Sequence, residues 1–332
     1  MIKQPKPSCL SIIIPALNEE HYINRCLEAI KKMNTENMDL EIIVVDNGST
    51  DKTVEISKSY GVKVLIKQEG TIASLRNYGA INSRGEFIAF LDADCIVPED
   101  WFEKALIYLQ HDRVIVGFRM TIPKNSNWVA RCWDLLFSRR YITTEVEWVP
   151  SGNMLIARET FMSIGGFKES LETNEDIDLC FRLRSNGYKV ISSSETVLIH
   201  LRPPRSLKEL FTKELWHGKE VFREFICDMR MRKDSNILKI KNIKVVFYAG
   251  FYLICIFLIM FSLFLSLIYK TVLPLFLAFF LPIFISFLLA LKYAKEVGRN
   301  NLILGMTILL IIYGTSRAVG LLLLMLKKFD NG

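Results

Sequence analysis

The sequence predicts an α/β domain with a mostly parallel sheet, followed by an α-helical membrane region. Short β-branched runs alternate with stretches of helical periodicity through the first half of the 332 residues. This order is typical of a parallel sheet that helices cover on both faces. Beyond about residue 244 the chain is almost continuously apolar. We therefore expect at least two structural units.

Four strands and four helices are expected in the first half. The strands are predicted at residues 10–15, 41–46, 62–66 and 86–92, with helices at 18–33, 49–60, 72–83 and from Pro98. Parallel sheets of this kind bind ligands beyond the carboxyl ends of their strands, so the strand ends define the candidate site. The sequence has no GxGxxG and no GxxxxGK motif, which argues against a dinucleotide-binding Rossmann domain and a P-loop kinase.

Three apolar stretches, 245–269, 272–291 and 302–326, are long enough to span a bilayer. Buried core helices of this length normally keep a polar stripe. The first two stretches show no such stripe and are predicted to span the membrane. The third contains Thr315, Ser316 and Arg317, so it either spans or lies partly in the interface; we favour spanning.

Basic residues predict the orientation of the membrane region. Residues 230–244 carry six Lys or Arg and one Asp, and Lys292, Lys295 and Arg299 follow the second stretch. Cytoplasmic flanks are enriched in Lys and Arg, so we expect an integral membrane protein with a cytoplasmic soluble part. A third crossing would place Lys327 and Lys328 on the opposite side, which is a mild conflict.

The net charge of +7 lies largely in this juxtamembrane segment. It indicates membrane lipids, particularly anionic ones, as partners, and we see no nucleic-acid motif. The short apolar run at residues 10–14 is too short for the core of a signal peptide.

Two carboxylates, Asp92 and Asp94, flank Ala93 at the end of the fourth predicted strand. At a strand end both can reach one hard cation, and oxygen ligands suit Mg²⁺ or Mn²⁺ bound through substrate phosphates. The alternative is a solvated strand end. The position after the fourth strand favours the metal site.

The first two strands end in polar loops that converge on the same edge. The first ends in Pro15, Ala16, Leu17, Asn18 and Glu19, and the second in Asp46 and Asn47. These residues could be only a turn and helix caps. We expect Ser49 or Thr50 to cap the next helix, which leaves Asp46 for a ligand; Glu19 could be an ordinary first-turn acid.

Glu175 and Asp176 open a further predicted helix within 173–190. They are either ordinary first-turn acids, favoured by the helix dipole, or a general base whose pKa is tuned by the adjacent like charge. The residues alone leave both readings open.

Five motifs in this order resemble family 2 glycosyltransferases with the GT-A fold over about residues 8–200. They are PALNEE, VVDNGSTD, RNYGAINSRGEFIAFLDADC, SGNMLIARETFMSIGGF and EDIDLCFRLRSNGY. The resemblance implies an inverting transfer of a sugar from a nucleotide-diphosphate donor. A divalent cation would neutralise the charge that develops on such a leaving group.

The resemblance also implies roles for the candidate residues. The nucleotide sugar would be bound by Pro15, Ala16, Asn18, Glu19, Asp46, Asn47, Arg76, Asp92, Ala93, Asp94 and Glu175, with Asp46 at the nucleobase. Asp94, assisted by Asp92, would hold Mn²⁺ or Mg²⁺, and Asp176 would deprotonate the acceptor. His200 matches a position that supplies a metal ligand in some relatives, and a structural histidine is the alternative.

The expected organisation is a catalytic domain at 1–204, a basic amphipathic interfacial segment at 205–244 and a membrane domain at 245–332. The tail resembles membrane-attached members that build polysaccharides or lipid-linked sugars, so a membrane-borne acceptor is expected. The processive QxxRW motif is absent, and Glu214–Gly218 occupies the corresponding region, which favours addition of single sugars. Acceptor loops are expected within 121–149.

Two other functions are compatible with parts of the sequence. Asp92 and Asp94 could belong to a haloacid-dehalogenase-like phosphatase, but there the motif normally follows the first strand. A catalytically inactive membrane scaffold is the second rival. The sugar, the nucleotide, the acceptor and the oligomeric state are left open.

Overall fold

The computed structural model describes residues 9–34, 39–137, 143–218 and 243–329. The chain forms two compact units, Met1–Lys124 with Arg140–Arg202, and Asn125–Arg139 with Pro203–Gly332. Residues 125–139 therefore fold with the second unit, although they lie within the range 1–204 expected for the catalytic domain.

The described residues of the first unit contain one nine-stranded sheet in the order β3-β2-β1-β4-β8-β6-β9-β5, with β7 paired to β9. The strands are β1 Cys9–Ala16, β2 Asp39–Asp46, β3 Lys63–Ile66, β4 Phe87–Leu91, β5 Cys95–Ile96, β6 Val114–Thr121, β7 Thr144–Glu145, β8 Asn153–Ala157 and β9 Lys189–His200. The pairs among β3, β2, β1 and β4 are parallel, as is β6 with β9. The expected mostly parallel α/β sheet is confirmed, with antiparallel pairing at β8, β5 and β7.

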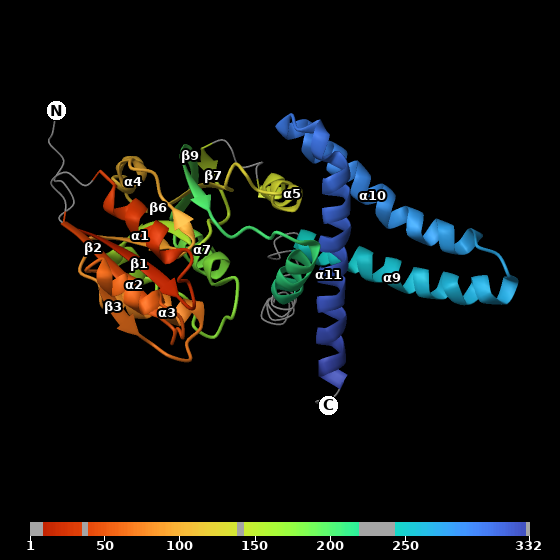
Figure 1. The fold of residues 1–332 in the computed structure, drawn as a ribbon, viewed down its shortest axis with the longest axis horizontal. Coiled ribbons are helices and arrows are strands. Elements are labelled where there is room, and N and C mark those ends of the chain that lie inside the picture. The colour runs from red at the N-terminus through yellow and green to blue at the C-terminus, as the bar shows by residue number, and fades with distance from the viewer. Residues whose placement is uncertain (1–8, 35–38, 138–142, 219–242, 330–332) are drawn as a thin grey trace. The chain divides into compact units, whose positions relative to one another are not determined.

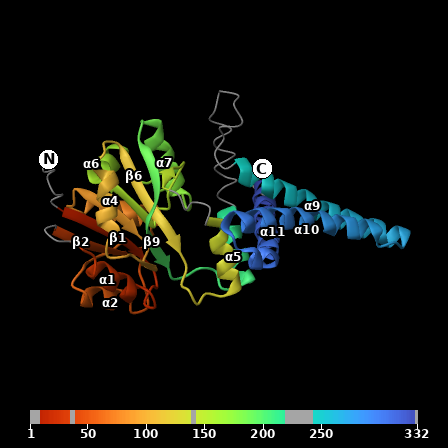
Figure 2. The ribbon, with the colours of Figure 1, turned by 90° about the horizontal axis from the view of Figure 1, so that it is seen from above.

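Helices cover both faces of this sheet (Figures 1 and 2). They are α1 Ile23–Lys31, α2 Thr53–Ser59, α3 Ile72–Ile81, α4 Trp101–Leu109, α6 Arg158–Ser163 and α7 Glu175–Ser185. β1 shows why both faces need a cover. Ile12 and Ile14 pack in the cluster that includes α1 and α4 residues, whereas Ile13 packs with residues of α3, α6 and α7. A strand buried on both faces reads as the continuous β-branched run found in the sequence.

The register of the parallel strands brings the expected site loops to one edge. Ala16, the last residue of β1, is opposite Asp46, the last residue of β2. The backbone N–H of Asn47 continues this pairing by donating to the Ala16 carbonyl at 2.9 Å. β4 is paired to the other side of β1 and ends at Leu91, directly before Asp92.

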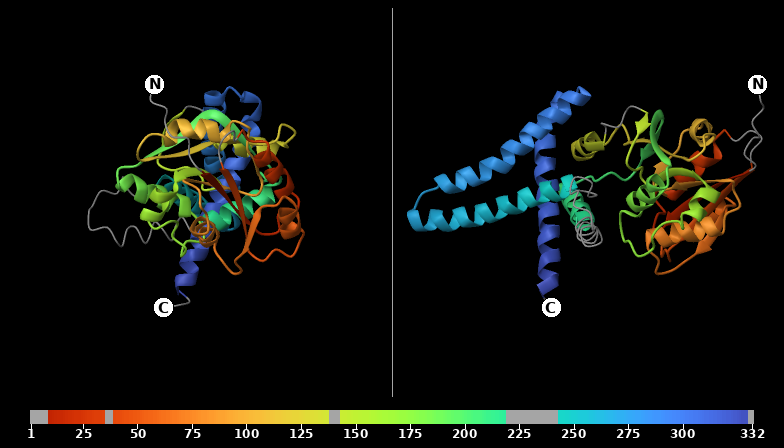
Figure 3. Two further views of the ribbon diagram at one scale, coloured as in Figure 1. Left: turned by 90° about the vertical axis from the view of Figure 1, so that its left-hand side faces the viewer. Right: turned by 180° about the vertical axis from the view of Figure 1, so that it is seen from behind.

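The second unit contains three long helices, α9 Ile243–Tyr269, α10 Leu273–Val297 and α11 Ile303–Phe329. By length and composition, the segments 245–269, 273–297 and 300–326 could each cross a membrane. α9 and α10 form a hairpin, and α11 runs across it rather than alongside it (Figures 1 and 3). Of the expected interfacial segment 205–244, the structure describes residues 205–218, with a helix over 207–218, and residues 243–244.

α5, Trp128–Phe137, and the helix at 207–218 pack against the long helices. Their shared apolar cluster contains Cys132, Leu135, Leu210, Ala290, Met306, Leu309 and Leu310. Most of the expected basic segment 230–244 lies outside the described residues.

Candidate active site

The turn after β2 is built around the Asp46 carboxylate, whose residue is 1% exposed. One oxygen accepts the backbone N–H groups of Gly48 and Ser49, both at 2.9 Å, and the other accepts the Ser49 hydroxyl at 2.5 Å. The expectation that Ser49 or Thr50 caps the next helix is wrong, because α2 begins at Thr53 and its cap residue, Lys52, makes no side-chain cap bond. The Asp46 side chain instead organises its own turn.

The β1–α1 loop is fastened to that turn. Asn18, in the left-handed region with φ 55°, accepts the Thr50 N–H through its side chain at 2.9 Å and donates its own N–H to the Ser49 hydroxyl at 2.8 Å. The N–H of Glu19 donates to the Thr53 hydroxyl at 2.7 Å. The loop that follows Pro15 and Ala16 is therefore fixed relative to Asp46.

A third loop is joined to the same edge through Asn47. The Asn47 side chain accepts the Gly70 N–H at 3.0 Å and donates to the Gly70 carbonyl at 3.1 Å. The three loops thus form one hydrogen-bonded rim, built largely from the residues predicted to surround the nucleoside.

Asp94 lies in a small charged cluster at the end of β4. One of its oxygens is 3.6 Å from Nε2 of His200 and 3.3 Å from Nε of Arg202. The sheet produces this arrangement, since β5 pairs with β9 so that Cys95 faces His200, and the Leu201 N–H donates to the Asp94 carbonyl at 2.8 Å. Asp94 and His200 are therefore together, as the metal hypothesis requires.

Arg202 also contacts Glu19, with 2.8 Å between its guanidinium and a Glu19 oxygen. Burial raises the pKa of Glu19 to about 7, against the lowering influence of Arg202 and with a further increase from Asp94. The second Glu19 oxygen is buried, with no hydrogen-bond partner among the described residues. Sequence reasoning did not single out Arg202, although it lies only two residues after His200.

Asp92 points into a different network, centred on the guanidinium of Arg76. Arg76 is 1% exposed and reaches an oxygen of Asp92 at 2.6 Å and an oxygen of Glu175 at 2.7 Å. Its guanidinium carbon lies 5.9 Å from the centre of the Phe167 ring. Arg76 was expected near the nucleotide; in the structure it is the bridge between the β4 end and the start of α7.

The loop before β8 closes this network. The Ser151 hydroxyl donates to Glu175 at 2.8 Å, and the Asp92 N–H donates to the Gly152 carbonyl at 3.1 Å. A side chain at Gly152 would overlap the Asp92 carboxylate. Neither residue was predicted individually, although both open one of the recognised motifs, SGNMLIARETFMSIGGF.

Asp176 differs from the other acids in the first turn of α7. Glu175 is paired with Arg76 and Asp178 with Arg182 at 2.8 Å, whereas Asp176 accepts backbone N–H groups, from Ile177 at 2.7 Å and from Ser151 at 3.3 Å. Burial, followed by the Glu175 charge, raises the pKa of Asp176 to about 7. A carboxyl group with that pKa can take up a proton near neutral pH.

The donor set around Asp94 fits a divalent cation that substrate phosphates help to hold. Among the described residues, no three His, Cys, Asp or Glu side chains form a complete cage. Mg²⁺ sites of nucleotide enzymes commonly use only one or two carboxylates together with phosphate oxygens. The Asp94 carboxylate supplies a hard oxygen donor of this kind, and the His200 imidazole, 3.6 Å from it, is a nitrogen donor beside it.

Comparisons with known proteins identify the family of this domain. Residues 11–166 match the family model described as glycosyl transferase family 2. They are a family 2 glycosyltransferase domain. Glycosyltransferase AglE of Haloferax volcanii is 28% identical over 237 residues, 66% of this chain and 75% of AglE. Succinoglycan biosynthesis protein ExoA of Rhizobium meliloti is 25% identical over 231 residues, 65% of this chain and 69% of ExoA.

Solved structures show the same fold as the family 2 domain. Mannosyltransferase PcManGT from Pyrobaculum calidifontis, in complex with GDP-Man and Mn²⁺, has a TM-score of 0.52 at 19% identity and covers 70% of each chain. Residues 1–349 of S. aureus TarS have a TM-score of 0.50 at 20% identity and cover 64% of this chain and 65% of that one. The expected GT-A fold is confirmed, and the family match of residues 11–166 favours a glycosyltransferase over a haloacid-dehalogenase-like phosphatase.

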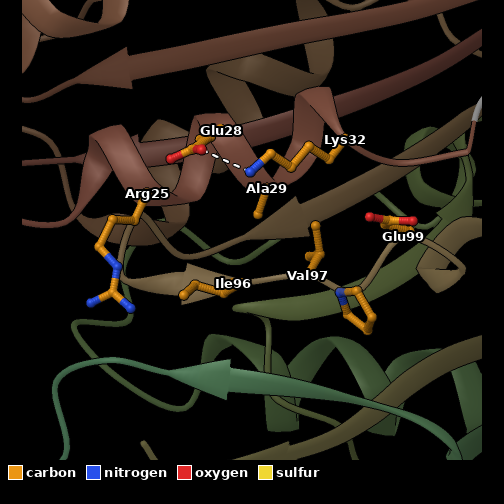
Figure 4. A pocket seen from close by; sticks show the side chains of 8 residues that line it. Arg25, Glu28, Ala29, Lys32, Ile96, Val97 and Glu99 are labelled. Carbon is orange, nitrogen blue, oxygen red and sulfur yellow. Dashed lines mark hydrogen bonds and ion pairs between the residues drawn. The ribbon is translucent and has the colours of Figure 1, made fainter.

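A separate pocket of the family 2 domain lies between α1 and the segment after β5 (Figure 4). It is lined by Arg25, Glu28, Ala29, Lys32, Ile96, Val97, Pro98 and Glu99. Glu28 and Lys32 form an exposed pair along α1 at its rim. None of the predicted site residues lines this pocket, so it is not the candidate active site.

The Arg76 network makes a stability prediction. Arg76→Met should lower the free energy of unfolding by roughly 3–5 kcal/mol, because it leaves Glu175 buried without its cation. Denaturant unfolding of the purified full chain in detergent measures this. The matched control is Arg84→Met, whose ion pair with Asp39 is exposed and should contribute less than about 1 kcal/mol. Equal effects of the two substitutions would contradict the bridging role.

Proposed function

We propose that this glycosyltransferase moves a sugar from a nucleotide-diphosphate sugar to a hydroxyl or phosphate group of a membrane-associated acceptor, with inversion at the sugar. The observation that carries the proposal is the link through Arg76, which joins the Asp92 end of the donor site to Glu175 beside Asp176. In this proposal, one hydrogen-bonded network joins the place where the nucleoside diphosphate leaves to the place where the acceptor proton is removed.

On the donor side, the hydrogen-bonded rim of the β1–α1 and β2–α2 loops would hold the nucleoside, with Asp46 and Asn47 towards the base. Asp94 and His200, with Asp92 nearby, would hold Mn²⁺ or Mg²⁺ against the diphosphate. Such an ion stabilises negative charge on a leaving nucleoside diphosphate. Arg202, already 3.3 Å from Asp94, can add positive charge at the same place.

On the acceptor side, Asp176 would remove the proton of an attacking hydroxyl. Its pKa of about 7 suits this role, because a base with a pKa near the working pH combines a useful ionised fraction with sufficient basicity. The backbone N–H groups of Ser151 and Ile177 orient the carboxylate. Inversion follows if the hydroxyl attacks the face of the sugar opposite the diphosphate.

A membrane-borne acceptor is supported by the apolar helices that could span a bilayer. The relative ExoA is named a succinoglycan biosynthesis protein, and a polysaccharide or lipid-linked sugar pathway fits that likeness. The basic residues of 230–244 support a catalytic domain on the cytoplasmic side, because cytoplasmic flanks are enriched in Lys and Arg. The lack of a QxxRW motif supports the addition of single sugars.

The base assignment predicts the kinetics of Asp176→Asn. The amide cannot take up the proton, so kcat should fall by roughly 10²–10⁴-fold while donor affinity stays within a few-fold. Radiolabelled sugar transfer and donor titration measure the two quantities. Asp178→Asn, in the same helical turn, is the control and should keep its turnover. A weakened donor affinity with normal kcat would contradict the assignment.

The raised pKa of Asp176 predicts the pH dependence. The carboxylate form is the active base, so kcat/KM should rise with pH and level off above about 7. Glu175 contributes to the raised pKa, so Glu175→Gln should move the midpoint to lower pH. A pH–rate profile that is flat between 5.5 and 8.5, about 1.5 units to either side of that pKa, would count against the proposal.

The metal assignment predicts the behaviour of donor binding. A matching nucleotide sugar with Mn²⁺, at about 100 times its dissociation constant, should stabilise the fold by about 2.7 kcal/mol. A thermal-shift screen of nucleotide sugars with and without Mn²⁺ identifies that donor. Asp94→Asn should lose the Mn²⁺-dependent part of the shift. An unchanged shift in this variant would remove Asp94 from the metal site.

A further inference from the structure

α11 is enclosed by protein in a way that the other two long helices are not. No residue of α11 between positions 309 and 322 is exposed, whereas α9 and α10 present exposed Phe, Leu and Ile side chains through residues 254–288. The buried share of the most apolar window is 39% in α11, against 17% and 22% in α9 and α10. The α9–α10 hairpin therefore has the surface of a lipid-facing element, and the middle of α11 does not.

The contacts of α11 with the hairpin lie at the hairpin's open end. The Tyr248 hydroxyl donates to the Leu310 carbonyl at 3.2 Å, and a side chain at Gly314 would overlap the Tyr252 ring. Ala290 of α10 packs in the same cluster as Leu309 and Leu310. Tyr248 and Tyr252 are near the start of α9 and Ala290 is in the last third of α10, away from the turn at 270–272 that joins them. The hairpin extends sideways from α11 in the views of Figures 1 and 3.

Two shorter helices, α5 and the helix at 207–218, also pack on α11. The helix at 207–218 contributes Leu210 to the cluster, and α5 contributes Cys132, against which a side chain at Gly305 would collide. Each of these two helices carries a tryptophan that is exposed by nearly half, Trp216 at 47% and Trp128 at 44%. Tryptophan is enriched at the boundary between bilayer and water.

A buried ion pair joins α11 to the helix at 207–218. Arg317, 8% exposed, places Nε at 3.0 Å and a terminal nitrogen at 2.5 Å from one oxygen of Glu214, itself 4% exposed. Burial, then the charges of Arg317 and Lys213, lowers the pKa of His217 to about 4, so this histidine is neutral beside the pair. A helix that carries Lys208 and Lys213 belongs at a membrane surface rather than in hydrocarbon, and the pair holds α11 beside it.

We propose that α11 does not cross the bilayer. It lies at the membrane interface on the catalytic side, between the open end of the α9–α10 hairpin and a cover made of α5 and the helix at 207–218. The chain then crosses the membrane twice, and the Glu214–Arg317 pair fastens the cover to α11. These three helices, α11, α5 and the helix at 207–218, would contact the lipid headgroups of the leaflet on the catalytic side.

This arrangement also changes the charge distribution across the membrane. With a third crossing, Lys327 and Lys328 would lie opposite the basic segment 230–244. With α11 at the interface, they lie on the same side as that segment and as Lys292, Lys295 and Arg299, in agreement with the positive-inside tendency. The proposal thus differs from the sequence expectation of a third span, and it does not depend on the proposed sugar transfer.

Reporter fusions to the full chain in a bacterial host test the topology. We expect a fusion after Gly332 and a fusion at the N-terminus to give the same result, fluorescent green fluorescent protein and inactive alkaline phosphatase. The control, an insertion between Lys270 and Thr271 in the hairpin turn, should give active phosphatase. Active phosphatase after Gly332, or inactive phosphatase in the hairpin turn, would overturn the two-crossing arrangement.

Paired substitutions test the fastening. Arg317→Leu should lower the midpoint of thermal unfolding in detergent by several degrees, because it leaves Glu214 buried and unpaired. Combining it with Glu214→Leu should restore most of that loss, since replacing both partners of a buried pair by apolar residues is often neutral. Arg299→Leu, at an exposed position, is the control and should change little. If Arg317→Leu is as mild as the control, or the double variant is no better than the single one, the pair does not fasten α11.

Discussion

One buried guanidinium constrains the arrangement of the catalytic unit. Arg76 is almost completely removed from solvent, and a buried charge is tolerated only when it is paired and hydrogen-bonded. Its two carboxylate partners come from different elements of the unit, Asp92 from the end of strand β4 and Glu175 from the start of helix α7. The position of each acid is therefore linked to that of the other.

This pairing explains why the neighbouring acids differ in character. Glu175 is buried, is paired with Arg76 and accepts a hydrogen bond from the Ser151 hydroxyl. Asp176, the next residue, accepts backbone N–H groups, and burial, followed by the Glu175 charge, raises its pKa to about 7. The different partners of these adjacent carboxylates fit a structural role for Glu175 and the proposed proton-accepting role for Asp176.

The sequence was informative where local pattern and strand order decide the structure. Strand periodicity located β1 to β4, and the rule that parallel strands share a carboxyl edge placed Asp46, Asp92 and Asp94 at one edge. The proximity of Asp94 and His200 was suggested only by family resemblance, because the antiparallel pairing of β5 with β9 that creates it has no local signal. Arg76 and Glu175 are 99 positions apart, so their contact depends on the tertiary fold. The turn at Asp46 was misread because the aspartate, and not the following hydroxyl residue, accepts the turn N–H groups.

The same distinction applies to the membrane region. Hydropathy identified all three long helices, but apolar composition alone does not separate a helix that faces lipid from one that is covered by protein. α11 is covered by residues that are distant in the sequence, Tyr252, Leu210 and Glu214. The hydropathy of α11 itself does not predict these contacts. Within the α11 sequence, Arg317 was a feature that indicated a difference from the other two long helices.

The central claim, that Arg76 joins the donor-side and base-side acids into one unit, is tested most directly by a double-mutant cycle. Unfolding free energies would be measured for Asp92→Asn, Glu175→Gln and the combination, in the full chain under identical detergent conditions. Each single substitution leaves Arg76 one charged partner, and the double substitution leaves it none. The double variant should therefore be less stable than the sum of the single effects by at least about 1 kcal/mol. Effects that add to within about 0.5 kcal/mol would mean that Asp92 and Glu175 are independent of one another.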